Sequence, residues 1–273
     1  MRDEYFTGRV LTVAGMDPTC GAGLPLDIRM ITHLGGIPQA AVTAITVQDT
    51  VQVTGVQAVT GTLVAQQMRA ALDDIGVDCI KLGMLATADI VKAVVETLER
   101  YPTIPVVADP VLAGTGGGVL LDPEGVDLWR STLLPRVTLV TPNLPEARIL
   151  TAGMVLPPAP SIQESMAIAL GHDGGSVLLK GGHGSGHEIV DFLWHRGHGH
   201  FYRHPRLEGG TFHGTGCALA SAIATFLALG SQMEEAVAKG LATVVKAMEN
   251  GLSPGRGQRL LNMFGRVWPC RSK

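Results

Sequence analysis

Strand-like and helix-like segments alternate along most of this chain, and this alternation constrains the fold more than any other feature. Short runs rich in β-branched residues predict strands over residues 10–15, 38–46, 51–59, 79–85, 105–112, 137–143 and 176–184. Amphipathic patterns between them predict helices over residues 24–35, 62–76, 87–101, 123–134, 144–151 and 161–171. Because parallel strands need a crossover, usually a helix, the alternation predicts an α/β fold with a mostly parallel sheet covered on both faces.

Local signals refine this expectation. Thr62 and Thr87 are the expected caps of two of the helices, and Arg196 with Gly197 marks a hairpin between strands at 188–195 and 200–205. Two further helices are expected after Gly216 and over residues 233–250. Residues 51–59 alternate polar and apolar side chains, which favours a strand at the periphery of the sheet.

The chain shows no linker and no internal repeat, so we expect one domain over residues 1–273 with a core at about residues 10–250. The net charge of −3 argues against a nucleic-acid partner or an anionic membrane surface. No apolar leader is visible, and the longest apolar run, residues 217–230, is too short to span a bilayer. Cys20, Cys79, Cys217 and Cys270 are widely scattered, which favours a cytoplasmic protein with reduced thiols.

Polar and glycine-rich motifs cluster where the predicted strands end. They are AGMDPTCGAG, TVQDT, KLGML, ADPVLAGTGGG, TPNLPEA and LLKGGHGSG. Ligands of open α/β sheets bind beyond the carboxyl ends of the strands. Each motif alone is a weak signal, but together they predict one binding site at that edge of the sheet.

The motif HGTGC, residues 213–217, precedes an apolar helix. Glycines permit close approach of a ligand to the backbone, and the first helical N–H groups attract negative charge. The same field is expected to lower the pKa of the Cys217 thiol. A free cysteine is also commonly a small buried hydrophobe, and position alone leaves these two interpretations even.

Three other motifs supply candidates for metal and phosphate binding. Asn143 and Glu146 are three residues apart, a spacing that puts both on one helix face and suits a Mg²⁺ held through its waters. Taken alone, a turn asparagine followed by a helix-start glutamate is the commoner explanation. Lys180 ends a strand before two glycines, in reach of a phosphate or simply exposed in a turn. Asp109 precedes Pro110 and is either a second metal or water partner or an ordinary turn acid.

Several common sites are missing from the sequence. There is no P-loop motif, and the glycines after the first strand do not have the spacing of a dinucleotide-binding loop. The histidines do not have the spacing of a metal cluster, and we expect most of them to be solvated. His213 is the one expected near the site.

The motifs together resemble those of the hydroxymethylpyrimidine and phosphomethylpyrimidine kinases of thiamine biosynthesis, in the ribokinase-like superfamily. The resemblance runs from about Val10 to Asn250, through AGMDPTCGAGLPLD, TAITVQDT, KLGML, ADPVL, TPNLPEA, LLKGGH and HGTGC in the family's order. It is specific because most of the superfamily has Gly-x-Gly-Asp where this chain has Cys217. It implies a three-layer α-β-α ribokinase-like fold and ATP-dependent phosphorylation of the hydroxymethylpyrimidine, and of its monophosphate, with Mg²⁺.

The resemblance also implies roles for individual residues. Cys217 would be the catalytic thiol or thiolate beside the substrate hydroxymethyl group, with the backbone of Gly214, Thr215, Gly216 and Cys217 forming the anion hole. Gln48 would bind the aminopyrimidine, since its carboxamide can both accept and donate. The remaining roles are the pyrimidine pocket, formed by Gly15, Ala22, Asp27, Met84 and Val111; the metal and phosphate site, formed by Asp109, Asn143 and Glu146; and the nucleotide phosphates, bound by Lys180 and Thr215. A homodimer is expected as well.

The chain departs from the family at several positions. Many relatives have a charged Lys-Ser-Gly-Asp-like lid segment where this chain has AGTGGGVLL, including Gly114–Gly118. Asp49 and Cys20 stand where asparagine and glycine are frequent. Two alternatives remain: a kinase of the same fold acting on pyridoxal or another vitamin-like alcohol, and a non-catalytic pyrimidine or nucleotide sensor.

Overall fold

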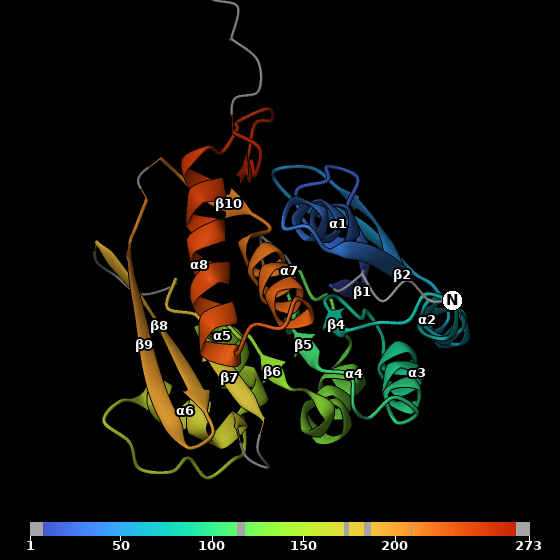
Figure 1. Cartoon of the computed structure of the whole chain (residues 1–273), viewed down its shortest axis with the longest axis horizontal. Coiled ribbons are helices and arrows are strands. Elements are labelled where there is room, and N and C mark those ends of the chain that lie inside the picture. Colours follow the sequence, from blue (N-terminus) through green and yellow to red (C-terminus); the bar gives the residue numbers. More distant parts are fainter. Residues whose placement is uncertain (1–7, 114–117, 172–174, 183–186, 208, 266–273) are drawn as a thin grey trace, which may run out of the picture.

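The computed structural model describes residues 8–113, 118–171, 175–182, 187–207 and 209–265. Within these residues one sheet has nine strands in the order β3-β2-β1-β4-β5-β6-β7-β8-β9 (Figure 1). The strands are β1 (Arg9–Met16), β2 (Ile37–Gln48), β3 (Val53–Ala58), β4 (Cys79–Leu82), β5 (Val106–Ala108), β6 (Leu139–Val140), β7 (Ser176–Leu179), β8 (Glu188–His195) and β9 (His198–Pro205).

The centre of this sheet is parallel and its edges are antiparallel. Strands β2, β1, β4, β5, β6 and β7 pair in parallel, whereas β3 at one edge and β8 and β9 at the other pair antiparallel. The expected mostly parallel sheet, the peripheral strand and the hairpin are therefore confirmed. A short pair, β10 (Phe212–His213) with β11 (Arg259–Leu260), lies outside the main sheet.

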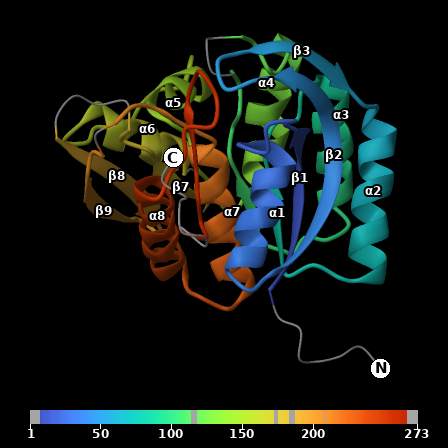
Figure 2. The ribbon, with the colours of Figure 1, turned by 90° about the horizontal axis from the view of Figure 1, so that it is seen from above.

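Helices cover both faces of the sheet (Figures 1 and 2). One layer contains α1 (Gly23–His33), α7 (Thr215–Ala228) and α8 (Met233–Glu249). The other contains α2 (Gly61–Asp74), α3 (Ala88–Leu98), α4 (Pro123–Leu128), α5 (Leu144–Leu150) and α6 (Ile162–Leu170), and α4 continues into a π-helical turn at Trp129–Leu133 and a 3₁₀ turn at Leu134–Arg136. None of the helices in the described ranges is both long and apolar enough to cross a membrane.

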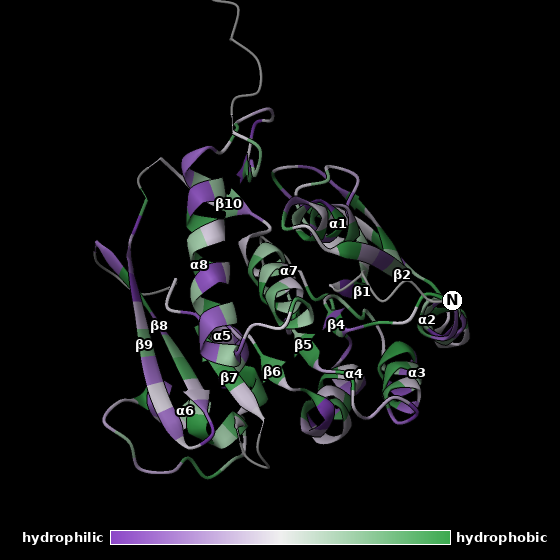
Figure 3. Ribbon diagram, in the orientation of Figure 1, coloured by the Kyte–Doolittle hydropathy of each residue, from purple (hydrophilic) through white to green (hydrophobic). Residues whose placement is uncertain are grey.

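Two apolar clusters, one on each side of the sheet, form the core. Adjacent residues of the central strands belong to opposite clusters, as Val10 and Leu11 do, because successive side chains of a strand point to opposite faces. Helix α7 lies beside α8 against the sheet and is hydrophobic along its length (Figure 3). This burial fixes the start of α7 against the ends of the central strands.

The start of α3 agrees with its expected cap, whereas the starts of α2 and α7 differ from the expectation. Thr87 caps α3 by accepting from the Ile90 N–H, as expected. The expected cap of α2, Thr62, is wrong: Thr60 is extended and accepts from Leu63, so α2 begins one residue earlier, at Gly61. Helix α7 also begins earlier than expected, directly after Gly214.

Candidate active site

The carboxyl ends of the central strands and the start of α7 surround one cavity of about 530 Å³. Most of the residues singled out in the sequence line it: Gly15, Ala22, Gln48, Met84, Asp109, Val111, Asn143, Glu146, Lys180, Gly214, Thr215, Gly216 and Cys217. Their convergence follows from the parallel sheet, which brings the ends of consecutive strands to the same edge. Of the glycine-rich segment expected to form a lid, residues 114–117 lie outside the described residues.

Asp27 is an exception among the residues that were expected to line the pyrimidine pocket. It does not line the cavity but is fully buried on α1, between the sheet and α7. Its carboxylate accepts hydrogen bonds from Lys81 Nζ at 2.7 Å, Thr12 Oγ1 at 2.6 Å and Ser221 Oγ at 2.8 Å. Asp27 therefore joins strand and helices beneath the site rather than forming a pocket wall.

The backbone at the start of α7 approaches its neighbours so closely that Gly214 must be glycine and Gly216 has little room for a side chain. Gly214 has φ +79°, and a Cβ there would lie 2.0 Å from the carbonyl oxygen of Gly21. A Cβ on Gly216 would lie 3.0 Å from Asp109 Oδ2 and 3.1 Å from Lys180 Nζ. The first intrahelical bond runs from Ala218 N to Gly214 O, so the three preceding N–H groups have no partner within the helix. Unpaired N–H groups at a helix start are the arrangement that binds anions in many proteins.

Cys217 lies in the first turn of α7 and is half-buried. Burial raises the pKa of Cys217 to about 11, the Lys81 ammonium opposes this, and the carboxylates of Asp27 and Asp109 add to it. The expectation that the helix start lowers this pKa is wrong, because burial and two nearby carboxylates outweigh the favourable charges. Cys79 is fully buried in β4, and burial raises the pKa of its thiol further.

An ion pair lies directly beside the start of α7. Lys180 Nζ is 2.7 Å from Asp109 Oδ1 and 4.0 Å from Glu146 Oε2. Although burial lowers the pKa of Lys180, the two carboxylates raise it above its ordinary value, so the side chain is an ammonium. Thr141 Oγ1 also donates to Asp109 Oδ1, at 3.2 Å, which holds that carboxylate in place.

Asn143 and Glu146 form a capping box at the start of α5. Asn143 Oδ1 accepts from the Glu146 N–H at 2.9 Å, and Glu146 Oε2 accepts from the Asn143 N–H at 2.7 Å. The common structural explanation of this pair is therefore correct, yet both residues also line the cavity. Burial raises the pKa of Glu146 to about 7, against the opposing effect of Lys180.

The donor set beside Lys180 fits Mg²⁺ better than a metal that needs a complete protein cage. Among the residues that the structure describes, no three His, Cys, Asp or Glu side chains come together as metal ligands. Asp109 and Glu146 nevertheless offer two carboxylates to the same cavity. Mg²⁺ usually keeps several waters and binds through one or two carboxylates together with substrate phosphates, so two carboxylates are sufficient.

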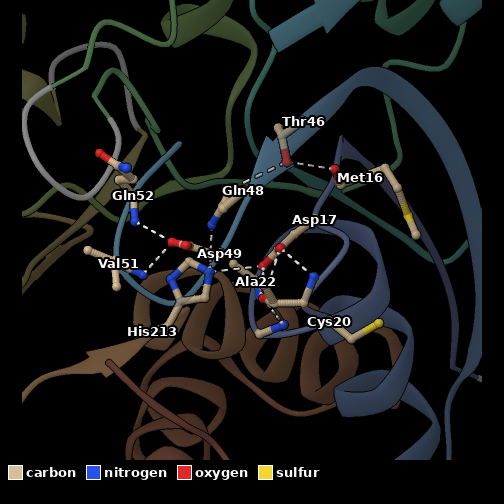
Figure 4. Close-up of polar contacts among 12 residues, drawn as sticks. Met16, Asp17, Cys20, Ala22, Thr46, Gln48, Asp49, Val51, Gln52 and His213 are labelled. Atoms are coloured by element: carbon tan, nitrogen blue, oxygen red, sulfur yellow. Dashed lines mark hydrogen bonds and ion pairs between the residues drawn. The ribbon is translucent and has the colours of Figure 1, made fainter. Parts of the chain in front are cut away.

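A second polar group, formed by Asp17, Gln48 and His213, also lines the cavity, and Figure 4 shows its contacts. His213, expected near the site, lies 2.7 Å from Gln48 Nε2 and 2.9 Å from Asp17 Oδ2, measured from its Nε2. Asp17 was not singled out from the sequence, although it lies within the first glycine-rich motif. An acid followed by proline and threonine directly after a strand was the available signal. His204 and its partner Asp191 also line the cavity and were not expected there.

Comparisons with known proteins agree with this geometry. The family model of phosphomethylpyrimidine kinase matches residues 17–262. A hydroxymethylpyrimidine/phosphomethylpyrimidine kinase of Escherichia coli is 36% identical over 94% of this chain and 98% of its own length. A thiamine biosynthesis bifunctional protein of Geobacter sulfurreducens is 39% identical over 96% of this chain, and this chain spans 53% of that relative's length.

Solved structures give the same result. A phosphomethylpyrimidine kinase of Clostridium difficile is 31% identical with a TM-score of 0.75, over 88% of this chain and 99% of that one. A pyridoxal kinase of Staphylococcus aureus in complex with AMP-PCP and pyridoxal is 29% identical with a TM-score of 0.83, over 96% of both chains. The fold is therefore ribokinase-like, as the resemblance implied. By its sequence, its architecture and its cavity, the chain belongs to the phosphomethylpyrimidine kinase family.

Proposed function

We propose that this protein transfers the γ-phosphoryl group of ATP to the hydroxymethyl group of 4-amino-5-hydroxymethyl-2-methylpyrimidine, and phosphorylates the monophosphate as well, for thiamine biosynthesis. The observation that carries the proposal is one cavity that holds the Gln48 carboxamide, the Cys217 thiol and the Lys180 ammonium. The names of the relatives support the substrate, and the AMP-PCP complex of the Staphylococcus aureus kinase supports ATP.

The pyrimidine binds at the end of the cavity that contains Gln48. The Gln48 carboxamide pairs with the ring, while Ala22, Met84 and Val111 supply apolar contacts. Gly15 leaves room for the Met84 side chain, because a Cβ at that position would lie 2.7 Å from Met84 Cε. The substrate hydroxymethyl group then faces the first turn of α7.

The start of α7 stabilises the phosphoryl group during transfer. The N–H groups of Thr215, Gly216 and Cys217 bind its oxygens, and Lys180 neutralises their charge. Phosphoryl transfer depends mainly on positioning and charge neutralisation, so a strong base is not required. With a pKa of about 11, Cys217 is a neutral thiol at neutral pH and acts on the substrate hydroxyl by hydrogen bonding.

Asp109, Asn143 and Glu146 would hold a Mg²⁺ ion through its waters. When bound, the ion would neutralise phosphate charge, which is its usual contribution to phosphoryl transfer. The apolar side chains that α8 contributes to the cavity, Leu241, Val244, Val245 and Met248, offer a surface for the adenine ring. Lys180 and Thr215 line the same cavity and would bind the nucleotide phosphates.

Pyridoxal is the second candidate substrate. The observation in its favour is the TM-score of 0.83 with the Staphylococcus aureus pyridoxal kinase, against 0.75 with the Clostridium difficile phosphomethylpyrimidine kinase. Incubation of the protein with ATP, Mg²⁺ and either hydroxymethylpyrimidine or pyridoxal, followed by mass spectrometry, separates the two. No phosphorylated product from either substrate would contradict both and favour a sensor.

Glu146→Gln tests the phosphate side of the site. A glutamine can retain the capping box, so we expect a folded protein that binds the pyrimidine but turns over much more slowly. Glu164→Gln is the matched control, because Glu164 has the same position after its cap, Ser161, on α6 and does not line the cavity. Wild-type turnover of Glu146→Gln at saturating Mg²⁺ would remove this residue from the site.

Gln48→Ala tests the pyrimidine side. We expect weaker pyrimidine binding with unchanged nucleotide binding, measured by calorimetry. Unchanged pyrimidine affinity would show that the pocket is assigned wrongly.

Three further properties belong to the proposal. The chain acts as one kinase domain, and as a homodimer, for which the exposed apolar side chains Ile45 and Val47 on β2 and Val56 on β3 offer a surface. Sedimentation of a monomer at micromolar concentration would refute the dimer.

The protein works in the cytoplasm, which the free thiols of Cys20 and Cys79 support.

A further inference from the structure

Asp17, His213 and Gln48 form a connected polar group at the pyrimidine end of the cavity (Figure 4). Asp17 is 3% exposed and His213 is 7% exposed, so their hydrogen bonds are shielded from water. His213 Nε2 lies 2.9 Å from Asp17 Oδ2 and 2.7 Å from the Gln48 amide nitrogen. One ring nitrogen therefore faces both a carboxylate and a carboxamide.

Asp17 is an ionised carboxylate and so can only accept hydrogen bonds. It accepts from the Thr19 N–H at 2.8 Å and from the Ala22 N–H at 2.9 Å. Although burial raises the pKa of Asp17, the hydrogen bonds from His213 and Thr19 hold it below its ordinary value. The contact between Asp17 and His213 is a hydrogen bond only if His213 Nε2 carries the proton.

A protonated Nε2 cannot accept a hydrogen bond from the Gln48 amide nitrogen. Two donors would then face each other at 2.7 Å. Amide oxygen and nitrogen have nearly the same shape, so their assignment follows from the hydrogen-bond network. The hydrogen bonds are satisfied when the carboxamide turns by 180°, so that its oxygen faces His213 and shares the Nε2 proton with Asp17.

Thr46, at the other side of the carboxamide, requires the same orientation. Thr46 Oγ1 donates to the Met16 carbonyl at 3.0 Å, and it lies 3.4 Å from the amide atom of Gln48 that does not face His213. Since its one proton is used, Thr46 can only accept from Gln48. The amide nitrogen of Gln48 therefore faces Thr46, in agreement with the argument from His213.

We infer that Asp17 and His213 are positioning residues that fix the orientation of the Gln48 carboxamide and so set which hydrogen-bonding pattern a bound ring must present. The inference rests on the proposed role of Gln48 in binding the pyrimidine. The ring must place a donor, such as an exocyclic amine, on the His213 side and an acceptor nitrogen on the Thr46 side. A 4-oxo analogue of the pyrimidine presents the reverse order, with an acceptor oxygen and a ring N–H.

The selectivity between these two ligands is the quantity to measure. Calorimetry with the 4-amino and 4-oxo forms of 5-hydroxymethyl-2-methylpyrimidine gives the affinity ratio for wild type, His213→Phe and Asp17→Asn. His213→Phe removes the donor that fixes Gln48, and Asp17→Asn removes the anion that requires a protonated Nε2. In both variants we expect the amino-to-oxo ratio to fall about 10- to 100-fold, the range of one buried mismatched hydrogen bond.

Controls separate this effect from general damage to the site. Asp49→Asn is the matched substitution, because Asp49 lies next to Gln48 but accepts only from Val51 and Gln52 on an exposed turn, and its ratio should stay at the wild-type value. Nucleotide affinity should be unchanged in all three variants. In turnover assays the loss should appear in KM rather than in kcat, since positioning of the ring is affected and the phosphoryl side is not.

The possible results are distinct. A ratio that is unchanged in both variants while Gln48→Ala still weakens pyrimidine binding would overturn the positioning role and leave the proposed pocket intact. No effect of Gln48→Ala would overturn both. The tautomer gives a test without substrate: a long-range ¹H–¹⁵N spectrum should show a protonated Nε2 on His213, and an unprotonated Nε2 would overturn the inference even if Asp17→Asn does not fold.

Discussion

The raised pKa of the half-buried Cys217 predicts a slowly reacting thiol, in contrast to the reactive one that its place at a helix start suggests. Burial raises its pKa from the ordinary 9.0 to about 11. Raising the pKa by about two units lowers the fraction of Cys217 that is thiolate near neutral pH by a factor of ~100. Since the thiolate is the nucleophile, Cys217 should react with iodoacetamide ~100-fold more slowly at pH 8 than a free model thiol.

The assay is mass-resolved alkylation over a range of pH. A Cys20→Ser background removes the one thiol that is exposed among the described residues, and Cys79 serves as the internal reference. The rate at Cys217 should rise about tenfold per pH unit up to about pH 11, because only the thiolate fraction changes. Cys79 should react still more slowly, and bound hydroxymethylpyrimidine should protect Cys217.

A rate at Cys217 that levels off below pH 9 would refute this reasoning. It would mean that the helix start and Lys81 stabilise the thiolate more than burial and the carboxylates destabilise it. Turnover gives a second check: Cys217→Ser should keep much of the activity if a neutral hydrogen bond is what matters. Cys217→Ala should lose on the order of 10²-fold, toward the low end of the range for a positioned acid–base group.

Three further predictions follow from the packing around the site. Lys81→Met leaves the Asp27 carboxylate buried without its partner, so the free energy of unfolding should fall by about 3–5 kcal/mol in urea titrations; a loss below about 1 kcal/mol would contradict this. Gly216→Ala places a methyl group 3.0 Å from Asp109 Oδ2, so turnover should fall at least about tenfold with little change in melting temperature. The pKa of Asp17 in the folded protein is held below its ordinary 3.8. The ionised Asp17 side chain therefore stabilises the fold above pH 3.8, and this stabilisation is lost as the pH falls through the pKa of the folded state. Asp17→Asn should therefore flatten the acid side of the stability curve, measured by thermal unfolding between about pH 2 and 5.

The sequence predicted the secondary structure and the architecture well, because both depend on local patterns. Period-2 apolar runs, amphipathic segments and glycine stops are properties of a few neighbouring residues. The parallel sheet then brings the ends of consecutive strands to one edge, so the clustering of Gln48, Asp109 and Lys180 could be predicted without coordinates. The caps could be predicted less well. Thr60 and Thr62 both have side chains that can cap a helix, and only the backbone conformation, which is extended at Thr60, decides which of them does so.

The chemistry at particular atoms was decided by the tertiary structure. The pKa of Cys217 depends on burial and on Lys81, Asp27 and Asp109, which belong to other elements, so a helix-start argument gave the wrong sign. Asp27 occupies a buried position because α1 packs it toward Lys81 and Ser221, which its place in a glycine-rich motif does not show.

The polar group around Gln48 likewise depends partly on the local sequence and partly on the tertiary structure. His213 is 165 residues from Gln48 and 196 residues from Asp17 along the chain. The sequence by itself determined that each of these residues stands at the end of a strand or before a helix. Only the tertiary structure brought them within hydrogen-bond distance, because donor, acceptor and burial are properties of the packed neighbours and not of the local pattern.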